Sequence, residues 1–299
     1  MRSRWIDFDG QGPLAFLAPA NGIPPQAYTP FIAPLLDTLH VMALTPWPMV
    51  TQTQPTRSCS WHWLAGDLAQ HLYEHRLTHV IGIGHSLGAV LALLTAARHP
   101  VLIRALVLMD PVILPRPFLH GLRILRLFGQ EHRLPLVKKA RRRRREFASR
   151  EEARTYFAQR TFFARWHPDA FEAYITHGLR ELENGRVGLA YPPEWEAAIF
   201  ASIPTDIWKW IGRVQCPVLV LYGERSNTFR PAARKCLRRA WPHAHFVALP
   251  RAGHMFPVEE PDRAAQVVRE WLHTQALTHP ATQPAPDNNE PVDGSTAPE

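Results

Sequence analysis

Two residue patterns, far apart in the chain, could together carry out nucleophilic catalysis. The first is the pattern G-x-S-x-G, which reads GHSLG at residues 84–88, and the second is a Gly-His pair that ends at His254. A serine hydroxyl is a weak nucleophile until a base accepts its proton, and histidine commonly serves as that base. We therefore predict that Ser86 is a nucleophile and that His254 is its general base.

The residues on either side of Ser86 predict the turn that would expose it. Residues 79–83 form a short apolar run with β-branched side chains, typical of a buried parallel strand, and residues 89–98 are rich in Ala and Leu and predict a helix. A Cβ on either flanking glycine would obstruct so sharp a corner. Because the helix starts directly after Ser86, its free N–H groups face the serine, and we expect the N–H of Leu87 to form half of an oxyanion hole.

With these two motifs, the sequence resembles the α/β-hydrolase superfamily over roughly residues 12–274. The resemblance implies a doubly wound, mostly parallel α/β sheet with an inserted helical cap. It also implies acyl transfer through an acyl-enzyme, with no metal and no organic cofactor. In relatives a His-Gly-x-Pro loop often supplies the second oxyanion N–H; here residues 21–24 read NGIP, and the donor would be Ile23.

The acid that orients His254 is where this chain departs from the superfamily pattern. Relatives commonly carry an Asp just beyond the strand equivalent to residues 218–222, but Asn227 stands at that place. Asp110 ends the strand after the Ser86 helix, where some members keep their acid, and it preserves the order Ser, Asp, His. We predict Asp110 as the acid, with Glu224 and Asn227 as the alternatives.

Strand and helix patterns divide the chain into three parts. Strands alternate with helices in residues 1–111 and 214–275, which predicts a core with helices on both faces of a parallel sheet. Residues 112–213 carry no strand pattern and predict a helical cap over the site. Residues 276–299 are rich in proline and predict a disordered tail. The first strands, at residues 5–8 and 14–18, are expected to form a hairpin-like pair.

The expected substrate is small to medium in size and carries an apolar acyl or alcohol group, because the predicted cap is rich in aromatic residues. A serine rather than an aspartate at the nucleophile position argues against a haloalkane dehalogenase, so an ester or related acyl bond is expected. Residues 45–48, which read TPWP, are expected to shape one wall of the pocket. The alternatives are a cofactor-free acyltransferase or peroxidase-like enzyme, and a binding protein without turnover.

Composition is that of an ordinary soluble protein, with 46% hydrophobic and 20% charged residues in a chain of 299. No stretch is long enough to span a membrane, and the start lacks the apolar core of a secretory signal, so we expect a cytoplasmic protein. Three widely spaced cysteines, Cys59, Cys216 and Cys236, argue against a disulfide framework and a zinc site, and we expect buried thiols. The oligomeric state is left open.

The net charge of +8 is concentrated in one run, because residues 138–145 read KKARRRRR and hold seven positive charges. Such a run could bind nucleic acid or membrane phosphates. No nucleic-acid-binding motif accompanies it, and Glu146, Glu151 and Glu152 follow closely. A solvated helix face is therefore favoured, and no nucleic-acid partner is expected. His71 and His75, four residues apart, lack a third ligand, so no metal site is expected.

Overall fold

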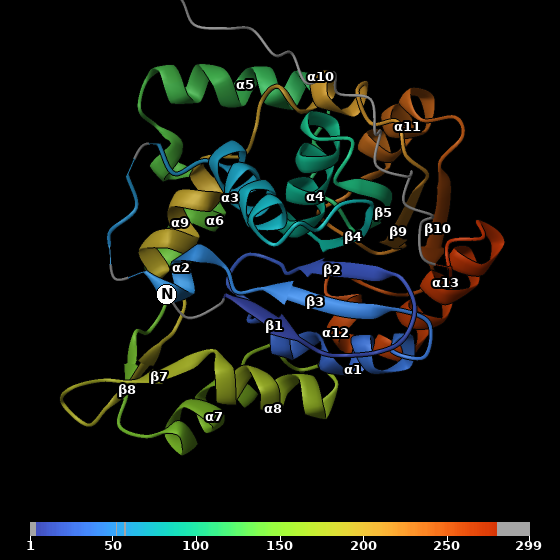
Figure 1. Ribbon diagram of the computed structural model, residues 1–299. Helices are drawn as coiled ribbons and strands as arrows, with labels where there is room; N and C mark the ends of the chain where they lie inside the picture. The colour runs from blue at the N-terminus through green and yellow to red at the C-terminus, as the bar shows by residue number, and fades with distance from the viewer. Residues whose placement is uncertain (1–3, 52, 57, 280–299) are drawn as a thin grey trace, which may run out of the picture.

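A seven-stranded sheet forms the centre of the computed structural model, which describes residues 4–51, 53–56 and 58–279. The strand order is β1-β3-β2-β4-β5-β9-β10 (Figure 1), and within this sheet the described pairs are parallel except that of β1 with β3. The predicted doubly wound α/β fold is confirmed. The strands are β1 (Trp5–Asp7), β2 (Leu14–Ala18), β3 (His40–Leu44), β4 (Val80–His85), β5 (Ile103–Met109), β9 (Val218–Gly223) and β10 (His245–Leu249).

Helices cover both faces of the sheet (Figure 1), so the side chains of alternate strand residues pack into two separate hydrophobic cores. In β9, for example, Leu219 and Leu221 enter one core, and Val218 and Val220 enter the other. Burial on both faces explains why these strands are continuous apolar runs. One face carries α1 (Thr29–Ile32), α12 (Phe256–Glu259) and α13 (Pro261–Thr274), and the other carries α3 (Trp61–Glu74), α4 (Leu87–Arg98) and α11 (Pro231–Ala240).

The first two strands do not form the predicted hairpin. β3 lies between them, paired antiparallel to β1 and parallel to β2. The glycines and proline at residues 10–13 predict that the chain turns there, but they do not predict which strands pair. The pairing depends on contacts between segments that are distant in the sequence. Prolines also divide the segment between β2 and β3 into short elements: η1 (Pro25–Tyr28), α1 and η2 (Ala33–Leu35).

Residues 112–213 are mostly helical but also contain a small antiparallel sheet, β6-β8-β7, which corrects the expectation that strands are absent there. These strands are two or three residues long, too short to give an alternating pattern. The elements are α5 (Arg116–Leu127), η3 (Glu131–Arg133), α6 (Pro135–Arg141), β6 (Glu146–Phe147), α7 (Arg150–Ala158), α8 (Pro168–His177), β7 (Leu179–Glu181), β8 (Val187–Leu189), α9 (Pro193–Ala201) and α10 (Ile207–Ile211).

Aromatic residues of this insertion join the cores of the main sheet. Phe157 and Tyr174 belong to the core that contains α13, whereas Trp195 belongs to the core that contains α3 and α4. The insertion therefore packs along both faces of the sheet. A further short helix, α2 (Trp47–Val50), follows β3. In the described residues, no helix is both long and apolar enough to cross a membrane.

Two smaller expectations need correction. Of the three cysteines, Cys59 and Cys216 are half-buried and Cys236 is exposed, so they are not all buried thiols. The chain also stays packed past the predicted start of the tail at residue 276, because Leu277 is buried and its carbonyl accepts a hydrogen bond from Arg104 Nη2 at 3.0 Å. The rest of the predicted tail, residues 280–299, lies outside the described residues.

Candidate active site

Ser86 lies at a sharp turn between β4 and α4. Its φ of 57° and ψ of −111° are values that residues with a side chain rarely adopt. The turn is closely packed, since a Cβ at Gly84 would lie 2.4 Å from the carbonyl oxygen of Gly88, and a Cβ at Gly88 would lie 2.0 Å from that of Ala18. Only glycine fits at these two positions, and the strained backbone at Ser86 is held by what surrounds it.

Three of the predicted site residues come together at the carboxyl edge of the sheet. His254 Nε2 lies 3.0 Å from Ser86 Oγ, and His254 Nδ1 lies 2.6 Å from Asp110 Oδ2. Asp110 follows β5 directly and is fully buried, whereas the side chain of His254 is about 20% exposed. Both separations are within hydrogen-bond reach, so a proton can pass from the serine to the histidine while the carboxylate holds the ring.

Asp110 has a hydrogen-bond donor for each of its oxygens besides His254. The backbone N–H of Gly223 donates to Oδ1 at 3.2 Å, and the hydroxyl of Ser226 donates to Oδ2 at 2.5 Å. These bonds compensate for burial of the carboxylate. Ser226 was not singled out from the sequence, although it lies in the loop after β9 where relatives commonly carry their acid.

The two alternatives to Asp110, Glu224 and Asn227, are engaged elsewhere. Glu224 is exposed, and its Oε2 accepts a hydrogen bond from the backbone N–H of Arg251 at 2.9 Å. Asn227 is also exposed, and its Oδ1 accepts from the Thr228 hydroxyl at 3.3 Å. The geometry therefore favours Asp110 over both.

The two predicted oxyanion donors differ in their surroundings. Leu87 is the first residue of α4, and the Ser86 side chain makes no capping bond to this helix. The N–H of Ile23, in contrast, donates to the carbonyl of Ala20 at 3.2 Å within its own turn. That loop abuts the Ser86 turn, because a Cβ on Gly88 would also lie 2.7 Å from the carbonyl oxygen of Pro19. Leu87 is thus the better-placed donor, and Ile23 would have to share or release its turn bond.

A buried chain of hydrogen bonds joins this loop to His254. The N–H of Ala20 donates to Tyr28 Oη at 3.0 Å, Tyr28 Oη lies 2.7 Å from His85 Nδ1, and His85 Nε2 lies 2.9 Å from the carbonyl oxygen of His254. Since a carbonyl can only accept, His85 carries its proton on Nε2 and accepts at Nδ1 from Tyr28. Sequence reasoning missed both residues, because nothing local links positions 28, 85 and 254.

Burial keeps both members of this chain neutral. It lowers the pKa of His85 well below the usual value, and the neighbouring His254 lowers it further. Burial raises the pKa of Tyr28. A neutral His85 can hold the backbone of His254 without placing a second positive charge beside the ring that must accept a proton.

A mostly apolar cavity of about 50 Å³ adjoins Leu87; the ion pair of Arg4 and Asp67 also lines it, and Ser86, His254 and Asp110 do not. Its lining includes Trp47 and the two prolines that flank it, Pro46 and Pro48. That the TPWP segment shapes a wall of the substrate pocket stays a prediction. Residues from the main fold and from the insertion meet here. They include Ala18, Pro19, Trp47, Leu87, Leu91 and Tyr191.

The insertion is tied to the loop that carries Ile23. Tyr191 Oη donates to Asn21 Oδ1 at 2.7 Å, and Asn21 Nδ2 donates to the carbonyl of Glu196 at 3.1 Å. The Glu196 carboxylate pairs with Arg143, which also donates to Tyr174 Oη at 2.7 Å. Asn21, which stands where relatives often have histidine, thus serves here as an anchor for the insertion.

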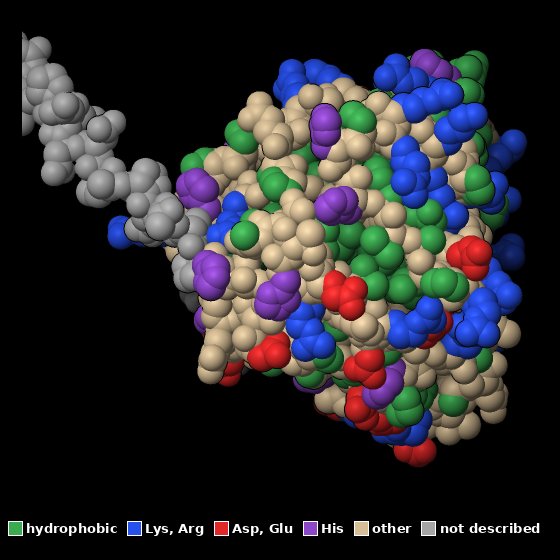
Figure 2. Space-filling model, turned by 90° about the vertical axis from the view of Figure 1, so that its right-hand side faces the viewer, with side chains coloured by type: hydrophobic (Ala, Val, Ile, Leu, Met, Phe, Trp, Pro, Cys, Tyr) green, Lys and Arg blue, Asp and Glu red, His purple; other side chains and the backbone are tan. Residues whose placement is uncertain are grey.

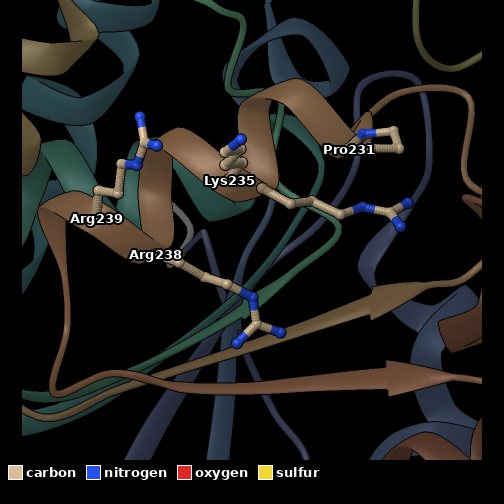
Figure 3. Close-up of a pocket in the computed structure, with 5 residues that line it drawn as sticks. Pro231, Lys235, Arg238 and Arg239 are labelled. Carbon is tan, nitrogen blue, oxygen red and sulfur yellow. The ribbon is translucent and has the colours of Figure 1, made fainter.

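A second hollow, on α11, belongs to another part of the surface. It is lined by Pro231, Arg234, Lys235, Arg238 and Arg239, and none of the three converging residues lines it (Figure 3). Arg238 stacks over the ring of Phe246 at 4.4 Å. Figure 2 shows the face that carries α11, with Lys and Arg side chains gathered over its upper part. Among the described residues, no group of three or more His, Cys, Asp or Glu side chains could hold a metal ion.

Comparison with known proteins places this geometry in context. A model of the Alpha/beta hydrolase family matches residues 5–267. The Abhydrolase domain-containing protein ACTT2-1 of Alternaria alternata is 26% identical over 229 residues, which make up 64% of this chain and 82% of that protein. The crystal structure of E-2-(acetamidomethylene)succinate hydrolase is similar with a TM-score of 0.73 at 20% identity, covering 90% of this chain and 94% of that one. A thermophilic esterase from Thermogutta terrifontis has a TM-score of 0.65 at 22% identity, covering 90% and 92%.

Proposed function

The chain belongs to the Alpha/beta hydrolase family, and from this premise we propose that it is a serine hydrolase that cleaves a carboxylic ester or related acyl bond through an acyl-enzyme. Ser86 is the nucleophile, His254 the general base and acid, and Asp110 the residue that orients His254. The substrate is a small to medium apolar molecule.

Acylation begins when Ser86 Oγ attacks the acyl carbon while its proton passes to His254 Nε2. The negative charge that develops on the carbonyl oxygen is stabilised by the N–H of Leu87, with the N–H of Ile23 as the second donor once it leaves its turn bond. When the tetrahedral intermediate collapses, the bond to the leaving alcohol breaks, and His254 gives that oxygen its proton. The products of this half-reaction are the free alcohol and the acyl-Ser86 ester.

Deacylation repeats these steps with water as the nucleophile. His254 Nε2 accepts a proton from water as the water oxygen attacks the acyl carbon, and the same N–H groups stabilise the oxyanion. Collapse breaks the bond to Ser86 Oγ, which takes back a proton from His254. The carboxylic acid leaves and the enzyme returns to its starting state.

The observation that carries the proposal is the continuous contact from Ser86 Oγ through the His254 ring to the buried Asp110, with separations of 3.0 and 2.6 Å. Acyl transfer requires a nucleophile that is hydrogen-bonded to a base, and a third group that orients this base. We further propose that the cavity beside Leu87, which none of these three residues lines, receives the acyl chain, and its volume of about 50 Å³ would fit only a short one.

Hydrolysis of short p-nitrophenyl esters tests the proposal. The wild type should release p-nitrophenol with saturation kinetics, and Ser86→Ala should lose about 10⁶-fold in kcat, as removal of a triad serine does elsewhere. Ser202→Ala is the matched control, because Ser202 bonds the carbonyl of Ile199 in the insertion, and it should keep full activity. Turnover in Ser86→Ala equal to that of the wild type would contradict the proposal.

The same assay separates hydrolysis from acyl transfer to another acceptor. Added alcohol competes with water for the acyl-enzyme, so the ratio of new ester to free acid reports which acceptor the site favours. We expect free acid to dominate at low alcohol concentration. New ester as the dominant product under those conditions would indicate an acyltransferase instead.

A further inference from the structure

Large apolar side chains are exposed on α5 and the turn that follows it. The exposed fractions are 56% for Ile124, 83% for Leu127 and 72% for Phe128, while Leu119 and Leu122 on the opposite side of the helix are buried. Ile124, Leu127 and Phe128 are spaced three and four residues apart, so they share one face. In Figure 1, α5 runs along the upper edge of the molecule, on the far side of α3 and α4 from the sheet. This helix thus carries an apolar stripe on its outer side as well as on its inner side.

This exposure is unusually concentrated. Of the ten large hydrophobic side chains exposed in the described residues, five lie within residues 118–136. Scattered single apolar residues on a surface need no explanation, but a group on one segment marks a site of interaction. We call residues 116–142, which contain this group, the α5–α6 surface.

The α5–α6 surface is also strongly cationic, with eight Lys and Arg residues and a single acid, Glu131. Arg126 is turned inward, where it donates to the carbonyls of Ala201 and Ile203, and Arg123 donates to the carbonyl of Thr205. The other six are exposed and form no ion pair with described residues: Arg116, Arg133, Lys138, Lys139, Arg141 and Arg142.

The basic run of the sequence therefore divides into two parts. Arg143, Arg144 and Arg145 pair with Glu196, Glu152 and Glu194 respectively. Of the acids that follow the run closely in sequence, only Glu152 is one of these partners. Within the part of the chain that the structure describes, the preceding cations Lys138, Lys139, Arg141 and Arg142 form no ion pair. The uncompensated charge of the run thus follows the apolar group of α5 along the chain, with only η3, which contacts both α5 and α6, between them.

A partner for this surface must accept apolar side chains and also carry negative charge. A second copy of the chain meets the first condition only, because two such faces would bring their uncompensated cations together. A bilayer with anionic lipids meets both conditions: apolar side chains enter the boundary between headgroups and acyl chains, and Lys and Arg contact the anionic headgroups.

We propose that the α5–α6 surface docks on an anionic lipid bilayer, with Ile124, Leu127 and Phe128 entering its boundary region. The chain lies on the membrane and does not span it. The loop of residues 111–115 joins α5 to Asp110, so the docking helix follows the site directly in sequence. Docking does not depend on the proposed chemistry, and Ser86→Ala should bind as the wild type does.

Sedimentation with vesicles tests the docking. The wild type should bind vesicles of phosphatidylcholine with phosphatidylserine, bind phosphatidylcholine alone weakly, and lose binding as salt is added. Leu127→Ser with Phe128→Ser should weaken binding by about tenfold or more. Replacing the four α6 cations from Lys138 to Arg142 by Gln should weaken it by about fivefold for each charge.

The matched control removes two exposed cations from α11, with Lys235→Gln and Arg239→Gln, and should change binding less than about twofold, since α11 lies outside the α5–α6 surface. All variants should keep the thermal midpoint and the hydrolysis of soluble esters. Three results would overturn the proposal: a wild type that stays in solution with anionic vesicles at low salt, equal losses in the α11 control, or a dimer that Leu127→Ser with Phe128→Ser converts to a monomer.

Discussion

Replacing Asp110 by asparagine tests how His254 is held, because the surroundings dictate how the new amide must lie. Asp110 Oδ1 accepts from the N–H of Gly223, whereas Oδ2 faces His254 Nδ1. The N–H of Gly223 is fixed by the backbone, whereas the Ser226 hydroxyl that donates to Oδ2 can rotate, so we expect the asparagine oxygen to stay toward Gly223. The NH₂ group is then directed at His254 Nδ1.

That orientation puts the proton of neutral His254 on the wrong nitrogen. An NH₂ group facing Nδ1 requires Nδ1 to accept, so the ring proton moves to Nε2, the atom 3.0 Å from Ser86 Oγ. Nε2 then cannot accept the serine proton. In a Ser-His-Asp triad this exchange lowers kcat by about 10⁴, or about 5 kcal/mol in the barrier, and we predict a loss of that order for Asp110→Asn with KM little changed.

The assay is hydrolysis of a short p-nitrophenyl ester, with thermal unfolding recorded in parallel to show that the variant is folded. Glu224→Gln and Asn227→Asp are matched controls, because both side chains are exposed and bonded elsewhere, and each should keep near-normal kcat. The double variant Asp110→Asn with Asn227→Asp should stay inactive, because the side chain at position 227 is exposed and does not contact His254. Near-normal kcat in folded Asp110→Asn, or its loss in Glu224→Gln, would refute this reasoning.

Two further predictions rest on burial and a third on the cavity beside Leu87. The pKa of His85 in the folded protein lies below its unfolded value of about 6.5, so the contribution of His85 to stability is complete above pH 6.5 and is lost as the pH falls toward the folded pKa, by up to about 1.4 kcal/mol per pH unit. The free energy of unfolding of His85→Gln should not show this loss at low pH. Parallel curves of unfolding free energy against pH for the wild type and the variant would contradict the prediction. Burial raises the pKa of the Cys216 thiol to about 11, so at pH 8 a thiol reagent should label Cys216 about a hundredfold more slowly than the exposed Cys236. Peptide mapping measures the two labelling rates, and equal rates would contradict the prediction. For p-nitrophenyl esters, kcat/KM should peak at a short acyl chain, because each methylene that the cavity accommodates adds about 0.8 kcal/mol of transition-state stabilisation. Trp47→Ala, which removes part of the cavity lining, should move the peak to longer chains. A kcat/KM that does not change with chain length would exclude the cavity as the acyl site.

The sequence predicted the parts of the site that depend on local geometry. The GHSLG corner requires glycine on both sides of Ser86 for close packing, and the apolar strand and Ala-rich helix around it were readable from composition. Asp110 could be named as a candidate because it ends a strand next to the Ser86 strand in a parallel sheet, where strand ends meet at one edge.

What the sequence did not predict depends on contacts between distant segments. The chain from Tyr28 through His85 to the His254 carbonyl joins three parts of the fold, and none of the three positions carries a local signal for it. The pairing of β1 with β3 is likewise a long-range choice, and the strands of the insertion are too short to show a period.

Labelling with a fluorophosphonate tests the central claim most directly, because this reagent reacts with a serine only where a base activates the hydroxyl and an oxyanion hole stabilises the adduct. The account predicts one adduct per chain, located at Ser86 by peptide mapping, absent in Ser86→Ala and strongly slowed in His254→Ala. A wild type that does not react, or a Ser86→Ala variant that is labelled as fast as the wild type, would contradict it.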